Sequence, residues 1–582
     1  MRHTKIVCTM GPACGDVEIL QKMLVAGMNV ARLNFSHGNH QDHLKQLTTA
    51  RQAASLLGYP LAALLDTKGP EIRLGEIEGS INLETGRKIV LTTDTVMGNT
   101  ERISVSYAGL PEDLRPGDRL SLDDGLIGLE VVEIKGAEIT CLIENGGELS
   151  GKKGVNVPGV HINLPSITEK DLQDILFAIE NKLDFVAASF VRTAADILEI
   201  KKVLEKHNSP LQIIAKIETQ AAVDNIEEIL EVADGVMVAR GDLGVEIPAE
   251  EVPLVQKRII TQCNLLGKPV ITATQMLDSM IRNPRPTRAE ASDVANAIID
   301  GTDAVMLSGE TAVGKYPVEA VATMARIAEK TEKTIFTGEE GSKISGLAGK
   351  SITGAIGHAT FAVAQELGAT AIITPTTSGS TARMVARHRP AAPIVAVSPS
   401  EVVCRQLLLV WGIIPIKTQK TEGTDAIITT GVQAALEADI ISLGDLVVIT
   451  AGIPVGIPGT TNLLKVHVVG NVVAQGQGIG RSVVTGTARL CKTAQDAIAK
   501  VTEGDILVAY GTDKHYMPAM KKAGALITME GGLTSHGAVV ALNLGIPIVV
   551  GIPNVMEVVE DGDVFTIDGS NGLVYKGVTK VL

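Results

Sequence analysis

Charged side chains follow several short apolar segments of this chain, and their types are those that bind phosphate esters. In Lys216-Ile217-Glu218 the two-residue period of a β-strand puts Lys216 and Glu218 on one face. A carboxylate pair such as Glu218 and Asp242 suits Mg²⁺, which keeps water and substrate oxygens as its other ligands. Cations beside Mg²⁺ are what a transferring phosphoryl group needs. The cations of this set are Arg32, Arg73, Lys216 and Arg240, and its anions are Asp66, Glu218 and Asp242.

Eight short β-branched segments, each followed by a helical pattern, position these side chains. This count predicts a (β/α)8 TIM barrel, in which functional groups gather at the carboxyl ends of the strands. The predicted strands are Thr4–Thr9, Asn29–Phe35, Leu61–Thr67, Phe185–Val191, Gln212–Glu218, Gly235–Asp242, Pro269–Gln275 and Asp303–Gly309. The predicted helices are Val17–Ala26, Gln41–Leu57, Glu169–Asn181, Ala194–Lys206, Ala221–Val232, Val252–Leu266, Ala289–Ile299 and Pro317–Lys330.

Other regions of the chain do not fit the barrel repeat. Strand and turn patterns fill the interval between the third strand and its helix, which predicts a small β-barrel lid inserted at the active face. A Gly/Ser-rich linker at Thr337–Gly349 and a hinge at Gly476–Gly480 are expected to separate two further units. We therefore expect a barrel at 1–68 and 167–340, a lid at 69–166, an open α/β domain at 345–473 and an appended swivelling-type β/α domain at 478–582.

Composition excludes several classes of protein. The net charge of −14 and the scarcity of aromatic residues among the 582 argue against nucleic-acid binding and against binding to anionic membranes. Pro547 and Pro553 interrupt the longest uncharged run, Gly537–Met556, so we expect buried strands and turns there and no membrane span. The six cysteines form no C-x-x-C pair and the start resembles no signal peptide, which predicts a cytoplasmic protein with reduced thiols.

Six motifs, in matching order and spacing over residues 1 to about 473, resemble the pyruvate kinase family. The resemblance implies phosphoryl transfer from phosphoenolpyruvate to ADP, giving pyruvate and ATP as the last step of glycolysis. It also implies a homotetramer. The motifs are Ala31–Gly38, Leu65–Arg73, Lys216-Ile217-Glu218, Ala239–Gly244, Ile271–Met280 and Asp303–Lys315.

The resemblance implies roles for individual residues. Glu218 and Asp242 match ligands of Mg²⁺ (or Mn²⁺), and Lys216 matches the lysine that stabilises charge on the phosphoryl group and the enolate. Arg32 is expected to hold the substrate phosphate, because a planar guanidinium binds phosphate in a bidentate manner. The implied pocket for the carboxylate end of the substrate is Gly241, Asp242 and Thr274, with the Thr274 hydroxyl in a proton relay. The implied nucleotide contacts are Arg73, Lys153, Asn34 and His37.

The resemblance also implies a site for K⁺. Its residues are Asn34, Ser36, Asp66 and Thr67, whose neutral oxygens and single carboxylate suit a weakly held monovalent cation. Glu71 matches the K⁺-dependent form of the family, whose independent form has Lys there.

Two local patterns suggest other chemistry. Gly309–Lys315 is nearly a phosphate-binding Walker A loop, but Tyr316 stands where Ser or Thr is required, so we interpret it as the last barrel loop. Lys216 could form a Schiff base as in an aldolase, although neighbouring carboxylates should keep it protonated.

A hydroxyl-rich segment follows a predicted strand in the α/β domain and precedes the predicted helix Ala382–Arg387. Backbone N–H groups and hydroxyls at a helix N-terminus can bind phosphate, although they can equally serve as an ordinary helix cap. The family uses this loop for an allosteric ligand, so we expect an activating phosphorylated metabolite there. The residues expected to bind it are Thr376, Ser378, Gly379, Ser380 and Thr381.

The segment Gly531–Gly537 resembles the phosphohistidine motif of the swivelling domain in phosphoenolpyruvate-utilising enzymes. His536 matches the phosphoryl carrier, whereas Gly537 stands where Ala is usual. Because no segment resembles the large ATP-binding domain of a dikinase, His536 is a relic, a regulatory residue or a working carrier. The rival functions are accordingly a dikinase-like phosphotransferase, a metal-dependent aldolase and a degenerate kinase kept as a metabolite sensor.

Overall fold

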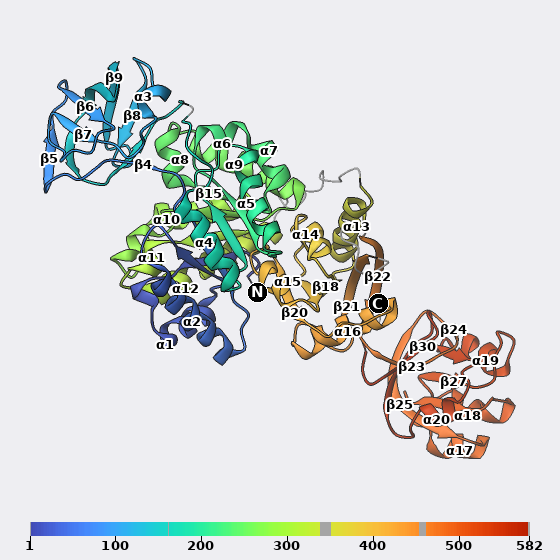
Figure 1. Ribbon diagram of the computed structural model, residues 1–582. Coiled ribbons are helices and arrows are strands. Elements are labelled where there is room, and N and C mark those ends of the chain that lie inside the picture. The colour runs from blue at the N-terminus through green and yellow to red at the C-terminus, as the bar shows by residue number, and fades with distance from the viewer. Residues whose placement is uncertain (1, 161, 338–350, 453–460, 580–582) are drawn as a thin grey trace. The chain divides into compact units, whose positions relative to one another are not determined.

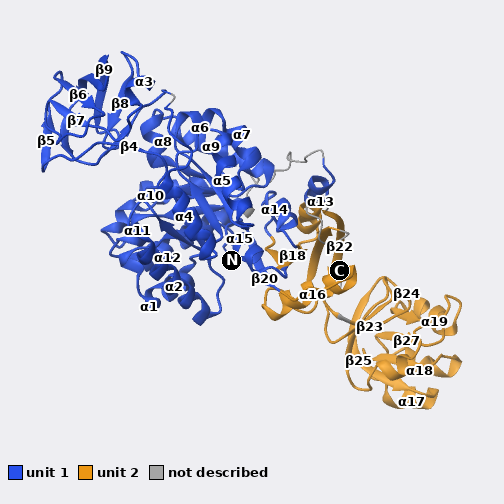
Figure 2. Cartoon of the chain, in the orientation of Figure 1, with its two compact units in different colours: residues 1–358, 377–391, 398–417 blue, residues 359–376, 392–397, 418–582 orange. Residues whose placement is uncertain are grey.

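The computed structural model describes residues 2–160, 162–337, 351–452 and 461–579. The predicted linker at Thr337–Gly349 lies, apart from its first residue, outside the described residues. The described chain groups into two compact units (Figure 2). Unit 1 comprises 1–358, 377–391 and 398–417, and unit 2 comprises 359–376, 392–397 and 418–582.

Unit 1 contains a closed barrel of eight parallel strands, which confirms the predicted fold (Figure 1). The strand order is β1-β17-β16-β15-β14-β13-β3-β2, so β1 closes the barrel between β17 and β2. Every barrel strand is almost fully buried, because its two faces pack against the barrel interior and the surrounding helices. The strands are β1 (Lys5–Thr9), β2 (Val30–Asn34), β3 (Ala62–Asp66), β13 (Phe185–Ala188), β14 (Gln212–Ile217), β15 (Gly235–Ala239), β16 (Val270–Ala273) and β17 (Ala304–Leu307).

Helices surround the barrel, and side-chain caps define where several of them begin. Asp16, Asn39, Thr168 and Thr287 each accept hydrogen bonds from first-turn N–H groups. The main helices are α1 (Val17–Ala26), α2 (His40–Leu57), α4 (Glu169–Glu180), α5 (Ala194–Lys206), α6 (Gln220–Asp224), α7 (Ile226–Val232), α8 (Arg240–Glu246), α9 (Val252–Leu266), α10 (Arg288–Ile299), α11 (Gly309–Ala312) and α12 (Pro317–Thr337). The 3₁₀ turns η1 (Pro12–Cys14) and η2 (Asp278–Ile281) lie between them.

Several predicted barrel strands extend past the observed ones, Phe185–Val191 and Gly235–Asp242 by three residues each, and one predicted helix is divided. The predicted strand Gly235–Asp242 ends at Ala239, and Arg240 begins α8. Ala239 is the last residue to pair with β16, whose chain turns away at Thr274 with φ 65°, so no partner strand continues. The predicted helix Ala221–Val232 is two helices that meet at Asn225, whose side-chain amide donates to the carbonyl O of Arg192.

The segment inserted after β3 is all-β and has its own apolar core. Its seven-stranded sheet has the order β4-β12-β8-β9-β10-β6-β7, and β11 pairs with β5 in a second sheet. Its strands are β4 (Ile72–Arg73), β5 (Ser80–Leu83), β6 (Lys88–Thr92), β7 (Arg102–Ser104), β8 (Arg119–Leu122), β9 (Ile127–Lys135), β10 (Glu138–Asn145), β11 (Gly147–Ser150) and β12 (Gly154–Asn156), and α3 is Leu110–Asp113.

The insert begins at Gly69, a position that requires glycine. Gly69 has φ +73°, and a Cβ there would lie 2.8 Å from the Cβ of Ser189. The chain entering the insert as β4 pairs antiparallel with β12, the chain leaving it. The first and last strands of the insert therefore form hydrogen-bonded partners next to the barrel mouth.

The α/β elements after the barrel are shared between the two units. In unit 2, β18 (Ala371–Pro375) pairs in parallel with β19 (Ile394–Ser398) and with β21 (Leu446–Gly452), and β22 (Thr461–Val468) is antiparallel to β21. The remaining elements are α13 (Ile352–Glu366), α14 (Ser380–Ala386), α15 (Glu401–Leu407), β20 (Ile413–Lys417) and α16 (Thr424–Glu437).

The C-terminal segment forms an eight-stranded sheet of order β23-β30-β29-β25-β26-β27-β28-β24. The stretch predicted as a hinge at Gly476–Gly480 contains β24, which pairs antiparallel with β28. Gly478 is needed there because a Cβ would lie 2.4 Å from the carbonyl O of Gly569. The elements are β23 (Asn471–Gln475), β24 (Gln477–Ile479), β25 (Val483–Cys491), α17 (Ala494–Lys500), β26 (Ile506–Ala509), η4 (Lys514–Tyr516), α18 (Met517–Met520), β27 (Ala525–Thr528), α19 (His536–Leu544), β28 (Ile548–Val550), α20 (Val555–Val558), β29 (Val564–Asp568) and β30 (Leu573–Lys576).

No helix in the described part of the chain combines the length and the apolar character that crossing a membrane requires.

Candidate active site

The carboxyl end of β14 places Lys216 at the centre of a buried ion cluster. Its Nζ lies 2.8 Å from Oε1 of Glu218 and 3.1 Å from Oδ1 of Asp66, and it donates to Oγ of Ser189 at 2.6 Å. Asp66 and Glu218 are each about 1 % exposed or less. The structure thus brings together ends of β3, β13 and β14, as a barrel mouth requires.

Arg32 joins this cluster from β2. Its Nε donates to Oδ2 of Asp66 at 2.6 Å, and its Nη1 donates to Oγ1 of Thr9 at 2.8 Å. Neighbouring strands β2 and β3 run in parallel and in register, so their carboxyl ends lie together. Asp66 is consequently the shared counter-ion of Arg32 and Lys216.

The cluster fixes the charges of Lys216 and Asp66, whereas Glu218 remains titratable. Burial alone would lower the pKa of Lys216, but Asp66 and Glu218 outweigh it and raise that pKa above its usual value. Burial would raise the pKa of Asp66, yet Lys216 and Arg32 keep it below the ordinary range. Burial raises the pKa of Glu218 to about 7, with Asp242 adding repulsion. Lys216 is therefore a cation at neutral pH, which disfavours a Schiff base because that needs a free amine.

Ser189 and Phe190 belong to the cluster although sequence reasoning did not select them. The Ser189 hydroxyl donates to the carbonyl O of Thr67 at 2.7 Å while it accepts from Lys216. The N–H of Phe190, which has φ 54°, donates to Oε2 of Glu218 at 2.6 Å. The place of Ser189 in the sequence could have identified it, because it is the first polar residue after β13.

Thr274 and Gly241 form a second polar group beside α8. The N–H of Gly241 donates to Oγ1 of Thr274 at 2.8 Å, and that hydroxyl donates to the carbonyl O of Ala273 at 2.7 Å. Thr274 and Gln275 both have positive φ, 65° and 53°. Such backbone conformations are unfavourable for residues other than glycine and persist only where surrounding contacts hold them.

Arg240 has a supporting place in this group. Its Nη2 donates to the carbonyl O of Thr274 at 2.8 Å, and its Nη1 lies 2.7 Å from Oδ1 of Asp293. It is thus bound to the chain around Thr274 and to α10, whereas Arg32 and Lys216 meet at Asp66.

Cations of the inserted segment face the barrel across a cleft of about 490 Å³. Arg73 and Lys153 line this cleft from the insert, and Phe190 and Asp242 line it from the barrel. Arg73 forms a two-bond pair with Glu71 at 2.6 and 2.9 Å, and Lys153 lies 2.8 Å from Oδ1 of Asp123. Both walls of the cleft therefore carry charges of both signs, with Glu71 and Asp123 beside the two cations of the insert and Arg192 as well as Asp242 on the barrel side.

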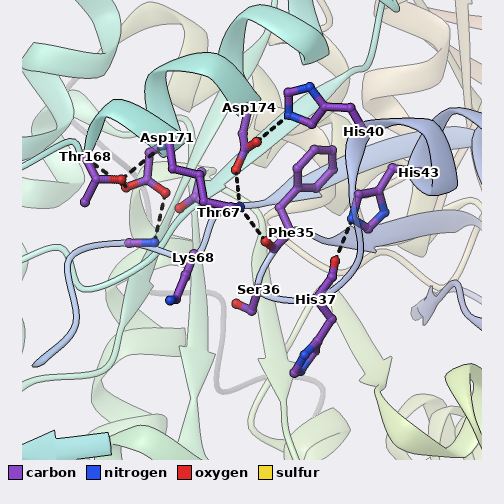
Figure 3. A network of polar contacts seen from close by, with 12 residues as sticks. Phe35, Ser36, His37, His40, His43, Thr67, Lys68, Thr168, Asp171 and Asp174 are labelled. Atoms are coloured by element: carbon purple, nitrogen blue, oxygen red, sulfur yellow. Dashed lines mark hydrogen bonds and ion pairs between the residues drawn. The ribbon is translucent and has the colours of Figure 1, made fainter. Parts of the chain in front are cut away.

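The residues predicted to hold K⁺ lie on the adjacent ends of β2 and β3. Asn34 pairs with Asp66 in the sheet, its Oδ1 accepts from the N–H of Ser36 at 3.2 Å, and Thr67 Oγ1 accepts from the N–H of Ser189 at 3.1 Å. Figure 3 shows Ser36, His37 and Thr67 in this region. Glu71 contacts Lys68 and Arg73 and is not among the contacts of these residues.

The carboxylate oxygens at the barrel mouth fit a divalent cation that takes some of its ligands from the protein and the others from water or substrate. Glu218 directly follows β14 and Asp242 lies in the first turn of α8, and the two carboxylates interact electrostatically. No group of three His, Cys, Asp or Glu side chains in the described ranges could hold a metal ion. A cation here would therefore depend on further oxygens from water or substrate, which is the behaviour of Mg²⁺.

The residues predicted for the effector lie around the start of α14. Gly379 has φ +78°, and the carbonyl O of Ser378 accepts from Nη2 of Arg383 at 3.1 Å. Thr381 is buried, whereas Thr377 is exposed.

His536 begins α19, and its Nδ1 lies 3.1 Å from Oγ1 of Thr512. The unusual Gly537 has a local reason, because a Cβ there would lie 3.1 Å from the same hydroxyl oxygen.

A TIM barrel whose strand ends hold a fixed lysine, an arginine and a carboxylate pair, facing basic groups across a cleft, is the architecture of a phosphotransferase. The family model described as the pyruvate kinase barrel domain matches residues 1–321, and that of the pyruvate kinase alpha/beta domain matches residues 354–467. The model of the PEP-utilising enzyme mobile domain matches residues 501–572. The chain belongs to the pyruvate kinase family.

Full-length relatives agree with this assignment. Pyruvate kinases of Geobacillus stearothermophilus and Bacillus licheniformis are each 56 % identical to this chain, over 585 and 586 residues respectively. The pyruvate kinase of Staphylococcus aureus strain MRSA252 is 50 % identical over 585 residues. In all three comparisons the match covers 100 % of both proteins.

Proposed function

We propose that the cleft between barrel mouth and insert is where phosphoenolpyruvate passes its phosphoryl group to ADP, giving pyruvate and ATP. The observation that carries this proposal is Lys216, a lysine kept charged by two buried carboxylates at the carboxyl end of a barrel strand. A permanent cation at this place offsets negative charge on the phosphoryl group during its transfer and on the enolate that the transfer produces.

Arg32 and the Thr274 group complete the substrate site. Arg32 has Nε on Asp66 and Nη1 on Thr9, which orients its guanidinium for a phosphate oxygen. The Gly241 backbone and the Thr274 hydroxyl suit the carboxylate end of the substrate. The Thr274 hydroxyl, already hydrogen-bonded to Gly241 and Ala273, can pass a proton towards the enolate.

Metal ions complete the charge balance. Arg32 contacts Asp66, Lys216 contacts Asp66 and Glu218, and Asp242 acts on Lys216 electrostatically, so the protein's own carboxylates already offset both cations before an anionic substrate binds. We assign Glu218 and Asp242 to Mg²⁺ (or Mn²⁺), which would neutralise phosphoryl oxygens. We assign Asn34, Ser36, Asp66 and Thr67 to K⁺, and Arg73, Lys153, Asn34 and His37 to the nucleotide.

One assay tests this function. Pyruvate formation from phosphoenolpyruvate should require ADP, a divalent cation and K⁺. Full turnover in buffer with only Na⁺ or choline, at saturating substrates, would contradict the K⁺ assignment. Activity that persists without ADP but disappears in His536→Ala would favour the dikinase-like alternative.

We further propose activation by a phosphorylated metabolite at Thr376–Thr381. The loop follows β18 and precedes α14, and the left-handed Gly379 places successive N–H groups at a helix start. Ser380→Asp should abolish the response to phosphorylated metabolites and leave the basal rate unchanged. A variant that keeps every such response would contradict the assignment.

The remaining proposals concern organisation. We infer a cytoplasmic homotetramer whose chain divides into a catalytic barrel, an inserted lid, an effector domain and an appended swivelling domain. Its partners are small molecules, with no nucleic acid or membrane surface. Size-exclusion chromatography with light scattering tests the tetramer.

A further inference from the structure

The last residue of β2, Asn34, and the loop that follows with Ser36 and His37 are part of the proposed site, and side chains outside the proposed mechanism hold the loop's backbone. Lys170 Nζ donates to the carbonyl O of Phe35 at 2.7 Å. His43 Nε2 lies 2.9 Å from the carbonyl O of His37. These two carbonyls flank Ser36, so the contacts determine the orientation of the loop's peptide groups.

Lys170 is itself held by a buried carboxylate one helical turn further along α4. Oδ2 of Asp174 lies 2.8 Å from Nζ of Lys170, and its Oδ1 lies 2.6 Å from Nε2 of His40. The Asp174 side chain is 1 % exposed, while those of Lys170 and His40 are 49 % and 43 % exposed. His40 is the first residue of α2, which follows the loop. Asp174 therefore connects α4 to the loop on one side and to the helix that leaves it on the other.

Aromatic packing fixes the same loop from within. The buried ring of Phe35 stacks on His43 with 4.0 Å between centroids, and it contacts Phe177 of α4 at 5.4 Å. Figure 3 shows Asp174 next to His40 and Phe35 between Asp174 and His43. Residues of α2 and α4 therefore contact both the backbone of the loop and the ring of Phe35.

The same end of α4 contacts the base of the insert. Oδ1 of Asp171 accepts from the N–H of Gly69 at 3.0 Å, and its Oδ2 accepts from the Thr168 hydroxyl at 2.6 Å. The first turns of α4 therefore touch both the loop after β2 and the point where the insert begins.

We propose that Lys170 and Asp174 are positioning residues for phosphoryl transfer, which keep the loop Asn34–Gly38 in the conformation that binds K⁺ and the nucleotide. The inference rests on the assignment of Asn34, Ser36 and His37 made above. Within the described ranges, Lys170 and Asp174 do not contact Lys216 or its counter-ions, so binding of phosphoenolpyruvate should respond least.

The main variant is Lys170→Met, which removes the donor and keeps the apolar stem. We expect the K⁺ concentration for half-maximal activity and the KM for ADP to rise about tenfold, with the KM for phosphoenolpyruvate within about twofold of wild type. Lys170→Arg restores a donor and should recover most of the effect. Lys202→Met is the matched control, because Lys202 pairs with the exposed Glu199 of its own helix α5 and, among the described residues, with no other carboxylate, so this variant should match wild type.

Three results would overturn the proposal. The first is an unchanged K⁺ and ADP dependence in Lys170→Met. The second is an equal rise in all three constants, which indicates general damage to the fold. The third is a Lys170→Arg variant no better than Lys170→Met. Asp174→Asn, which leaves His40 and Lys170 without their shared charge, should reproduce the Lys170→Met pattern.

A further variant separates this inference from the proposed function. Asn34→Ala removes a proposed K⁺ ligand directly. If Asn34→Ala changes the K⁺ dependence and Lys170→Met does not, the positioning role is wrong and the K⁺ site stands. If Asn34→Ala has no effect on the K⁺ dependence, the K⁺ site and the inference built on it are both wrong.

Discussion

Two buried lysines of the barrel unit have opposite electrostatic surroundings. Lys216, after β14, contacts Asp66 and Glu218 directly, and its pKa is raised. Lys5, the first residue of β1, donates to the carbonyl O of Ile413 at 2.6 Å. Burial and, to a smaller extent, the neighbouring Arg2 lower the pKa of Lys5 to about 7, because the attraction of Glu332 and Asp303 does not compensate.

The comparison shows that burial does not decide whether a lysine is charged. Burial disfavours the ammonium form at both sites, but only Lys216 has carboxylates within ion-pair distance. Lys216 therefore stays cationic, as its proposed role in phosphoryl transfer requires, whereas the pKa of Lys5 lies near neutral pH. The following experiments test this contrast, beginning with the largest expected effect.

Lys216→Met should lower kcat by about a thousandfold, because it removes the cation that offsets charge in the transition state. Lys5→Met is the control at the other lysine and should keep kcat within about twofold, since Lys5 takes no part in the proposed site. Steady-state pyruvate formation measures both. A Lys216→Met variant impaired only in KM would contradict the charge-stabilising role.

Asp66→Asn should lower kcat by about a hundredfold and destabilise the protein by about 3 kcal/mol, because it leaves Arg32 and Lys216 without their shared buried counter-ion. Urea unfolding and steady-state kinetics measure the two effects. Glu199→Gln, which breaks an exposed pair with Lys202, is the control and should change neither quantity appreciably. Wild-type stability in Asp66→Asn would mean that Asp66 is not the counter-ion.

The pH dependence of stability should reveal Lys5. Its pKa falls from 10.5 in the unfolded chain to about 7 in the fold, so between these values the unfolded chain holds a proton that the folded chain has lost. The free energy of unfolding should therefore rise with pH above 7, by up to about 1.4 kcal/mol per pH unit, with the full penalty present below pH 7. Urea unfolding at pH 7, 8 and 9 should show a smaller slope in Lys5→Met. Equal slopes would show that Lys5 stays charged in the fold.

Ser189→Ala should have the smallest effect, about fivefold in kcat, because it removes one hydrogen bond of Lys216 and leaves both carboxylates in place. The pH profile of kcat should keep its shape, since the Lys216 charge depends on Asp66 and Glu218. A new alkaline limb in the profile would show that the hydroxyl, and not the carboxylates alone, keeps Lys216 protonated.

Local sequence signals were sufficient for most elements of the barrel. The helices Val17–Ala26, Ala194–Lys206 and Val252–Leu266 have the predicted bounds. Two of these ends have clear chemical causes, because Asp16 caps the first helix and the left-handed Gly267 ends the third. Strand ends were predicted less well, as at Gly235–Asp242, because a strand ends where its neighbour turns away, and that neighbour is distant in sequence.

The sequence by itself determined the barrel class, the family and the charged residues that follow the barrel strands, because each depends on short motifs and their order. Tertiary structure alone decided which charges meet. Asp66 and Lys216 are 150 positions apart and become partners only when β3, β13 and β14 are neighbours in the closed barrel. Three other contacts also depend on the folded chain, because their partners are distant in sequence. They are the bond of Lys216 to Ser189, the contacts of Arg240 with Thr274 and Asp293, and the bond of Lys170 to the carbonyl O of Phe35. Ion pairing and burial act over a few ångströms, so they follow the packing of the chain and not its local pattern.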